Sequence, residues 1–133
     1  TIDVNKPRTT DGITPLYMAC NNGHVKIVRA LYEHGANVNQ PRNDGWSPLI
    51  LMTYIGRSDM VELLLSFDDI DVSCTFLSKT PIEWALPNVR ATSWVGWESL
   101  ESYIDQEGRA KCLAMLSEEV TTAVHRPSVI IYE

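Results

Sequence analysis

Long apolar runs are missing from this chain of 133 residues. The longest candidate, Met60 to Phe67, is short and is interrupted by Glu62, whereas a membrane-spanning helix needs about 20 apolar residues. The N-terminus also lacks the basic and then apolar segment that is typical of a secretion signal. We therefore predict no membrane segment, and a composition with 44% hydrophobic and 21% charged residues indicates a folded domain.

Cysteine and histidine are scarce, and neither forms a recognisable site. The three cysteines, Cys20, Cys74 and Cys112, are an odd number without CxxC spacing. This pattern favours free thiols in a reducing compartment, the cytoplasm or the nucleus. The three histidines have no metal-ligand spacing, and nucleophile-elbow, phosphate-loop and HExxH motifs are all missing. The sequence therefore predicts no enzyme, no metal and no cofactor.

Positive charge is the third deficit, with 11 Lys and Arg against 17 Asp and Glu, for a net charge of −6. Residues 1–66 are balanced, so the whole excess lies in residues 67–133. An acidic second half argues against binding to nucleic acid, which needs a basic face. It favours a basic protein partner, or it serves solubility alone.

One phrase recurs at a fixed interval. "DGITPLYMA" (Asp11–Ala19) returns as "DGWSPLILM" (Asp44–Met52) and, more weakly, as "LSKTPIEWA" (Leu77–Ala85). The prolines of the three copies are 33 residues apart, at Pro15, Pro48 and Pro81. Thr or Ser before each proline can cap a helix, and proline suits the first helical position. Each copy therefore predicts the start of a helix.

The sequence after each of the first two copies follows the same plan. Gly23 and Gly56 are expected to end the first helices, and a second helix follows. Its apolar stripe is Ile27, Val28 and Leu31 in the first unit and Met60, Val61 and Leu64 in the second. Gly35 should close the second helix of the first unit, whereas Asp68 stands at that place in the next unit, so that end should differ. Such units are too small to bury their own apolar faces, and we predict that they stack.

This pattern resembles the ankyrin repeat family. The match rests on "DGITPLYMACNNGHVKIVRALYEHGANVN" (Asp11–Asn39) and "DGWSPLILMTYIGRSDMVELLLS" (Asp44–Ser66). The resemblance implies an all-α solenoid of helix-turn-helix repeats with short β-hairpin-like turns. The family usually has a histidine after Thr-Pro-Leu. Tyr17, Ile50 and Glu83 stand there, so the polar network of that histidine is in question in every unit.

The predicted domain is a single array with one interruption. Its parts are residues 1–9 (the tail of a preceding repeat), 10–42 and 43–75 (two repeats), 76–125 (a repeat with an insertion at about 86–107) and 126–133 (a C-terminal tail). The helical pattern resumes at Gly108, with Cys112, Leu113 and Leu116 expected to face inward. Because the chain starts at Thr1 and not at Met, we expect it to be a fragment of a longer array.

The insertion and the tail leave alternatives open. Pro87 should stop or distort the preceding helix, and residues 98–105 can form a short acidic helix. Trp94 and Trp97 either pack the insertion onto the stack or contact a partner. The tail "RPSVIIYE" (Arg126–Glu133) is a strand-like cover, a linker or a docking peptide.

The resemblance also implies where a partner binds, because ankyrin repeats usually hold partners on the concave side of the stack. The turn tips and the ends of the first helices that match this side hold Asp11, Ile13, Asn21, Asn22, Asn43, Asp44, Trp46, Tyr54, Ile55, Phe76, Leu77 and Lys79. Trp46, Tyr54 and Ile55 are singled out as an interface anchor, on the premise that core packing does not need large apolar groups there.

The sequence therefore predicts a monomeric protein–protein interaction module that binds a protein or peptide, of basic character, through its concave face. The alternative is a regulatory or targeting segment of a larger multidomain enzyme or channel, acting within its own chain.

Overall fold

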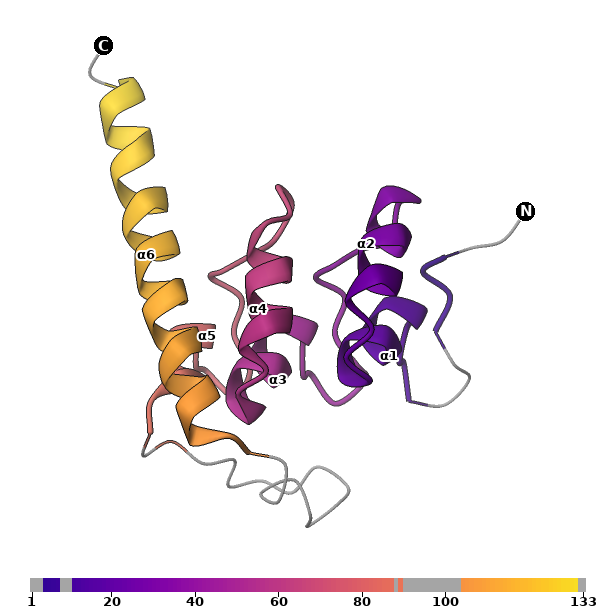
Figure 1. The fold of residues 1–133 in the computed structure, drawn as a ribbon. Coiled ribbons are helices and arrows are strands. Elements are labelled where there is room, and N and C mark those ends of the chain that lie inside the picture. The colour runs from indigo at the N-terminus through magenta and orange to yellow at the C-terminus, as the bar shows by residue number, and fades with distance from the viewer. Residues whose placement is uncertain (1–3, 8–10, 88, 90–103, 132–133) are drawn as a thin grey trace.

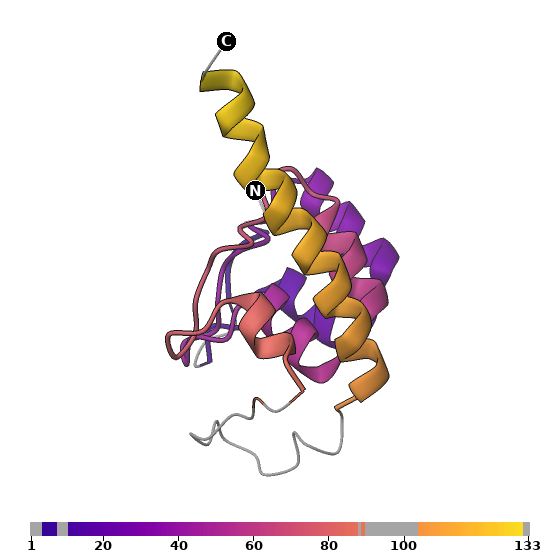
Figure 2. The ribbon, with the colours of Figure 1, turned by 90° about the vertical axis from the view of Figure 1, so that its left-hand side faces the viewer.

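The computed structural model describes residues 4–7, 11–87, 89 and 104–131, with side chains as far as residue 118. This part of the chain contains six helices: α1 (Pro15–Asn21), α2 (Val25–Glu33), α3 (Pro48–Ile55), α4 (Ser58–Leu65), α5 (Pro81–Ala85) and α6 (Gln106–Ile131). They form successive pairs, α1 with α2, α3 with α4, and α5 with α6, stacked side by side (Figure 1). The turns between pairs lie together on one side of the helices (Figure 2). The predicted all-α solenoid is confirmed.

The three equivalent prolines each open a helix, because the residue before each one caps it. The hydroxyl of Thr14 accepts the Tyr17 N–H at 3.1 Å, and that of Ser47 accepts the Ile50 N–H at 3.2 Å. The third cap is the most complete, since Glu83 also accepts the backbone N–H of Thr80 at 2.8 Å. A local signal in the sequence therefore fixes the same helix start in every unit.

The position that holds histidine in the family behaves differently in each unit. The Tyr17 and Ile50 side chains are buried in the core. Within the described residues the Tyr17 hydroxyl has no hydrogen-bond partner. Glu83 is exposed and instead closes the cap of α5. The histidine network is thus replaced by packing in two units and by a capping box in the third.

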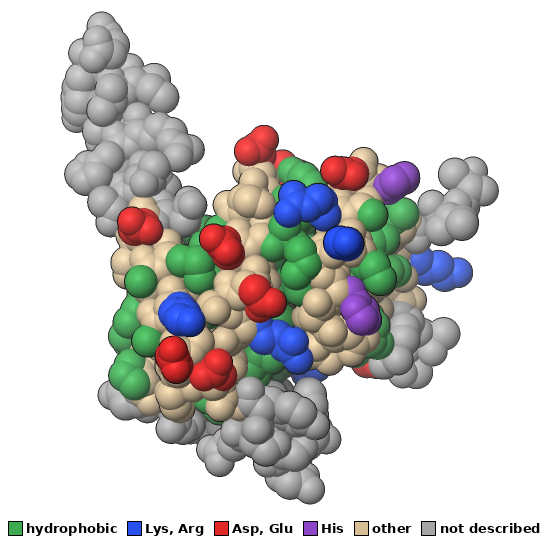
Figure 3. Space-filling model, in the orientation of Figure 1, with side chains coloured by type: hydrophobic (Ala, Val, Ile, Leu, Met, Phe, Trp, Pro, Cys, Tyr) green, Lys and Arg blue, Asp and Glu red, His purple; other side chains and the backbone are tan. Residues whose placement is uncertain are grey.

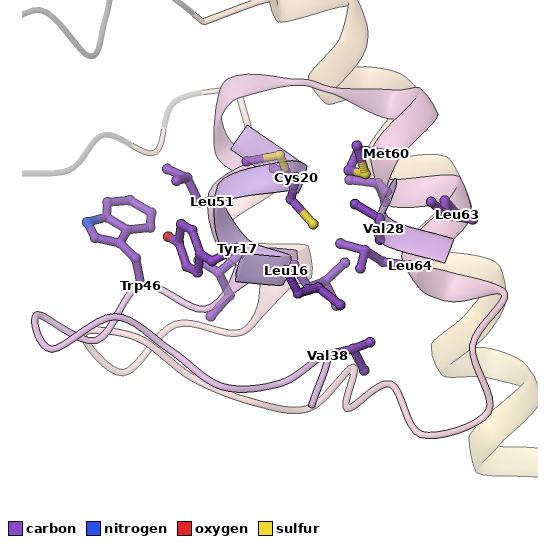
Figure 4. Packing of buried hydrophobic residues seen from close by; sticks show 14 of the residues in the cluster. Leu16, Tyr17, Cys20, Val28, Val38, Trp46, Leu51, Met60, Leu63 and Leu64 are labelled. Atoms are coloured by element: carbon purple, nitrogen blue, oxygen red, sulfur yellow. The ribbon is translucent and has the colours of Figure 1, made fainter. Parts of the chain in front are cut away.

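The core lies between neighbouring pairs. Met60, Val61 and Leu64 of α4 are fully buried, together with Val28 of α2. Figure 4 shows Met60, Val28 and Leu64 at one end of the cluster and Tyr17 beside Trp46 at the other. Ile27, which we expected to face inward, is 50% exposed. Its counterpart Met60 is buried because a preceding pair of helices covers it, and α2 has no such neighbour among the described residues.

Asparagine side chains tie each unit to the next. The Asn39 side-chain oxygen accepts the Asp71 N–H at 2.9 Å, and its amide donates to the Asp69 carbonyl at 2.8 Å. Asn5 makes the same pair of bonds one unit earlier, to the Asn37 N–H and the Gly35 carbonyl. Asn5 is thus bonded to the first unit as Asn39 is bonded to the second, and that residues 1–9 are the tail of a preceding repeat stays a prediction. The boundaries of the repeats stay a prediction.

The turns resemble hairpins only at their tips. Phe76 and Lys79 form an antiparallel bridge with backbone bonds of 3.0 and 3.1 Å, the only bridge in the part of the chain that the structure describes. Leu77 and Ser78 at its tip have φ values of 54° and 65°. L-residues seldom adopt this left-handed conformation, so the tip departs from the glycine-containing turns of the first two units.

The C-terminal helix differs from prediction. α6 runs without interruption across residues 125 and 126 to Ile131, so the strand-like cover proposed for the tail is wrong. Three consecutive apolar residues, Val129–Ile131, fit a helical or a strand period equally well. Cys112 and Leu116 are buried as expected, whereas Leu113 is only half-buried.

The predicted insertion lies mostly outside the described residues. α5 ends at Ala85, just before Pro87, and α6 begins at Gln106. Trp94, Trp97 and most of the predicted acidic helix at 98–105 fall in the part between that is not described. None of the described helices is both long enough and apolar enough to cross a membrane.

Candidate partner-binding surface

The three turn tips and the helices α1, α3 and α5 share one side of the stack, which we call the hairpin face (Figure 2). Its tips lie at residues 11–14, 43–46 and 76–79. The Asp11 carbonyl accepts the Asn43 N–H at 3.0 Å, so the first two tips are hydrogen-bonded to each other. This link holds the spacing of neighbouring tips fixed.

A cluster of four aromatic rings lies beneath the second and third tips. Trp46 is in contact with Tyr54, Phe76 and Trp84, at ring-centroid distances of 5.6, 4.5 and 5.2 Å respectively. Tyr54 meets Trp84 edge-on at 5.3 Å. These separations are those of favourable aromatic pairs. The Trp84 indole N–H donates to the Phe76 carbonyl at 3.0 Å, so α5 is bonded to the third tip.

The prediction that Trp46, Tyr54 and Ile55 form an exposed anchor is wrong in its premise. Trp46 is 0% exposed and Tyr54 is 1% exposed, and Ile55 is also buried. Phe76, which we expected at the surface of a tip, is buried as well. The third unit covers the second with Phe76 and Trp84, so these side chains pack the core and present no area to a partner.

Trp84 is the residue that sequence reasoning missed. It is fully buried and contacts the other three rings. A signal was available, because Trp84 lies one repeat period after Leu51, itself a buried residue of α3. A large aromatic residue at that place predicts an enlarged aromatic contact between two neighbouring units.

The other predicted residues that the structure describes all keep at least partial exposure. Asn22, Asn43, Asp44 and Leu77 are exposed, and Asp11, Ile13, Asn21 and Lys79 are half-buried. Leu77 is 45% exposed, an apolar side chain at the tip of the third turn. The exposed part of the hairpin face, which we call the rim, is therefore mainly polar. Leu77 is its one exposed apolar residue among those predicted, and the aromatic anchor is not part of it.

Charges on this rim are of both signs and are held by local contacts. Arg42 donates to the Asp44 carboxylate through both its Nε and a terminal nitrogen, and its guanidinium lies 5.8 Å from the centre of the Tyr17 ring. The Lys79 ammonium lies 5.5 Å from the Trp84 ring centre. Each cation is thus positioned at the edge of the aromatic core, which orders the rim.

The thiols are placed for packing. All three cysteines are free, and Cys20 and Cys112 are fully buried. Burial raises the pKa of Cys20 and of Cys112 to about 12. Burial also raises the pKa of Cys74, which is only half-buried, with its sulfur 3.7 Å from the Ser47 hydroxyl. No group of three or more His, Cys, Asp and Glu among the described residues is arranged to hold a metal.

This burial predicts selective thiol labelling. In the folded protein at about pH 8, Cys74 should react with an aromatic disulfide reagent, whereas Cys20 and Cys112 should be protected until denaturant is added. A thiol with a pKa of about 12 is ionised in roughly one molecule in ten thousand at that pH. Labelling followed by peptide mass spectrometry checks the assignment, with the Cys74→Ser variant as control. Rapid native labelling of Cys20 would contradict the packing described here.

Stacked helix pairs with turns on one shared side define a helical-repeat solenoid. A family model described as "Ankyrin repeats (3 copies)" matches residues 2–76. The chain belongs to the ankyrin repeat family. The match ends where the third turn begins, so α5 and α6 lie beyond it.

Relatives share short stretches with this chain. It is 38% identical over 64 residues to "Potassium channel AKT1" of Oryza sativa subsp. indica, covering 48% of this chain and 7% of that protein. It is 35% identical over 83 residues to "BCL-6 corepressor-like protein 1" of Homo sapiens, covering 62% and 5%. With "Rabankyrin-5" of Mus musculus the identity is 34% over 82 residues, covering 53% and 7%. The chain therefore spans only a small part of the length of these curated relatives.

Proposed function

We propose that this chain is a protein–protein interaction module that holds a protein or peptide partner along the hairpin face. The observation that carries this proposal is the regular series of turn tips fixed on a continuous core. Ankyrin repeats generally act as protein-interaction modules, so membership of the family supports the same conclusion. The role is one of binding, with neither catalysis nor a cofactor.

The rigidity of the face supports the proposal. The second and third tips stand on the buried ring cluster, and the first is bonded to the second. A surface that is ordered before binding loses little conformational entropy when a partner arrives. The exposed residues Asn22, Asn43 and Leu77 can then select the partner by hydrogen bonding and by one apolar contact.

The character of the partner follows from charge. On the rim, Asp11 and Asp44 are balanced by Arg42 and Lys79, so the face itself does not favour one sign. The net charge of −6 belongs to the chain as a whole and favours a basic protein over nucleic acid through long-range attraction. We propose that the module acts as a monomer, and the free cysteines support a reducing compartment, the cytoplasm or the nucleus.

An affinity-capture experiment with paired variants tests the proposal. The variant of the hairpin face, called the tip variant, combines Leu77→Asn at the third tip with Asn22→Arg at the C-terminal end of α1, and both positions are exposed. Asparagine tolerates the positive φ of residue 77 better than most residues, so the fold should be retained. We expect the tip variant to lose partners that the unmodified chain captures from a cell extract, with a melting temperature nearly unchanged.

The control variant makes matched changes on α2, away from the tips. Ile27→Asn removes an exposed apolar side chain and Ala30→Arg adds one positive charge at an exposed site. Partners should be identified by mass spectrometry of the captured fraction. Capture that is unaffected by the tip variant, or is reduced equally by the control, would remove the hairpin face as the binding site.

A second candidate is a regulatory or targeting segment that acts within its own, longer protein. The relative described as a potassium channel favours this alternative, since this chain matches only a short stretch of that protein. The same capture experiment separates the two candidates. Retrieval of a segment encoded by the same gene supports action in cis, and retrieval of a separate protein supports an adaptor role.

A further inference from the structure

The outer side of the molecule carries a groove between α4 and α6. Two open hollows of about 410 and 260 Å³ lie along these helices and share Glu62 and Met115 in their walls. Together they extend from Ser58 to Ser66 along α4 and from Lys111 to Glu118 along α6. At 1.5 Å per helical residue, this outer groove is roughly 12 Å long. It lies on the second helices of the pairs, apart from the turn tips.

The floor of the outer groove is apolar. Leu65 and Met115 are half-buried side chains that pack against the main core, and Ala114 is exposed and lines the larger hollow. Methionine is flexible and adapts to different apolar partners. The floor is therefore a strip of core that stays open to solvent between two helices.

The rim of the outer groove is predominantly acidic. Asp59 and Glu62 project from α4, and Glu118 projects from α6. Lys111 is the basic residue among those that line the two hollows, and it pairs with Glu107 one turn away at 3.9 Å. Both members of that pair are more than half exposed, so it holds its geometry weakly. Figure 3 shows acidic side chains in the majority over α4 and α6.

The acidic character is local to this part of the outer side. On the neighbouring helix α2, Lys26 and Arg29 are both exposed, with Glu33 further along. The balance of charge therefore changes sign from α2 to the α4–α6 groove. A charged partner can therefore distinguish this groove from the surface of α2.

We propose that the outer groove docks a short amphipathic helix from another protein, with an apolar stripe facing Leu65 and Met115 and basic residues on both flanks. A helix that lies in a groove uses apolar anchors at i, i+3, i+4 and i+7, and about two turns of it fill the length available. Lysine or arginine flanks meet Asp59 and Glu62 on one wall and Glu118 on the other.

The negative charge of the rim favours some classes of partner and disfavours others. Nucleic acid and anionic membranes present phosphate groups, which the carboxylates repel. A second copy of this chain has a net charge of −6, so long-range repulsion opposes its approach to the groove. A basic peptide helix is attracted by the same carboxylates that exclude the others.

A defined synthetic probe tests this proposal independently of the hairpin face. The probe is a fluorescent peptide of about 14 residues, roughly 20 Å of helix, with leucine at the i, i+3, i+4 and i+7 positions and lysine elsewhere. A scrambled peptide of identical composition has the same charge without the stripe. Binding to the 133-residue chain is followed by fluorescence anisotropy at about 50 and about 500 mM salt.

The decisive variant is Glu62→Lys combined with Glu118→Lys, which reverses one charge on each wall. Its matched control, Glu33→Lys with Asp68→Lys, makes the same change in net charge at exposed positions outside the outer groove. We expect at least a roughly tenfold loss of probe affinity in the first variant, a smaller change in the control, and weaker binding of the scrambled peptide. Equal losses in both variants, equal binding of the two peptides, or no binding at all would overturn the proposal.

Discussion

The Trp46→Ala and Tyr54→Ala double variant should lose most of the stability of the folded chain. Both side chains are buried within one cluster of rings. Truncation of a buried aromatic residue to alanine costs about 3–5 kcal/mol, and a domain of this size is stable by about 5–15 kcal/mol. Trp46→Ala alone should therefore lower the urea midpoint strongly, and the double variant should be largely unfolded at room temperature. Circular dichroism with urea titration measures both effects.

Two further variants make this prediction specific. Leu77→Ala truncates an exposed apolar side chain near the cluster and should change stability by no more than about 0.5 kcal/mol. Trp46→Phe keeps a ring in the core and removes an indole N–H that has no acceptor among the described residues. It should cost less than about 1.5 kcal/mol. A Trp46→Ala protein as stable as the original chain would place Trp46 at the surface after all.

The sequence alone could predict where the helices begin, because helix capping depends on residues that are close together in the chain. Thr14 and Pro15 determine a helix start with residues that are adjacent in the chain. The same holds for the end of α3 at Gly56, which has the left-handed conformation expected of a glycine cap. Signals of this kind need no knowledge of which units lie next to each other.

The burial of Trp46 could not be predicted in the same way, since it depends on distant residues. Phe76 and Trp84 come from the next unit, and their sizes decide whether Trp46 is covered. The family pattern usually leaves its position variable and therefore suggested a surface. Asn22 and Leu77 are exposed, as a partner contact requires, and their role in binding stays a prediction.

The contact between the start of α6 and the short connection from α3 to α4 is the other feature that local sequence patterns do not show. The Asp105 N–H donates to the Ile55 carbonyl at 2.8 Å. A Cβ on Gly108 would overlap the backbone carbonyl of Gly56. Arg109, which follows, is buried and donates to the carbonyls of Trp84 and Leu86 at 2.8 and 2.6 Å. The start of α6 is thus held to the end of α3 by a backbone bond and to the end of α5 by the Arg109 side chain.

Gly108→Ala should therefore be destabilising, although helix propensity predicts the opposite sign. Alanine is better than glycine within a helix by about 1 kcal/mol. At residue 108 the added methyl group meets backbone that cannot move aside as a flexible side chain would. We expect a net loss of about 1–3 kcal/mol, measured by urea unfolding. The Asp105 amide should also exchange with solvent faster, because its bond to Ile55 is loosened.

Ala110→Gly, at an exposed site two residues further along α6, supplies the reference for propensity. It should lose about 1 kcal/mol, so that glycine is the worse residue at 110 and the better one at 108. Stabilisation by Gly108→Ala, with the Asp105 amide still protected, would show that residue 108 has room for a methyl group beside the Gly56 carbonyl. If alanine is the more stabilising residue at 110 and glycine is the more stabilising residue at 108, then backbone contact between units, and not helix propensity, explains the glycine at 108.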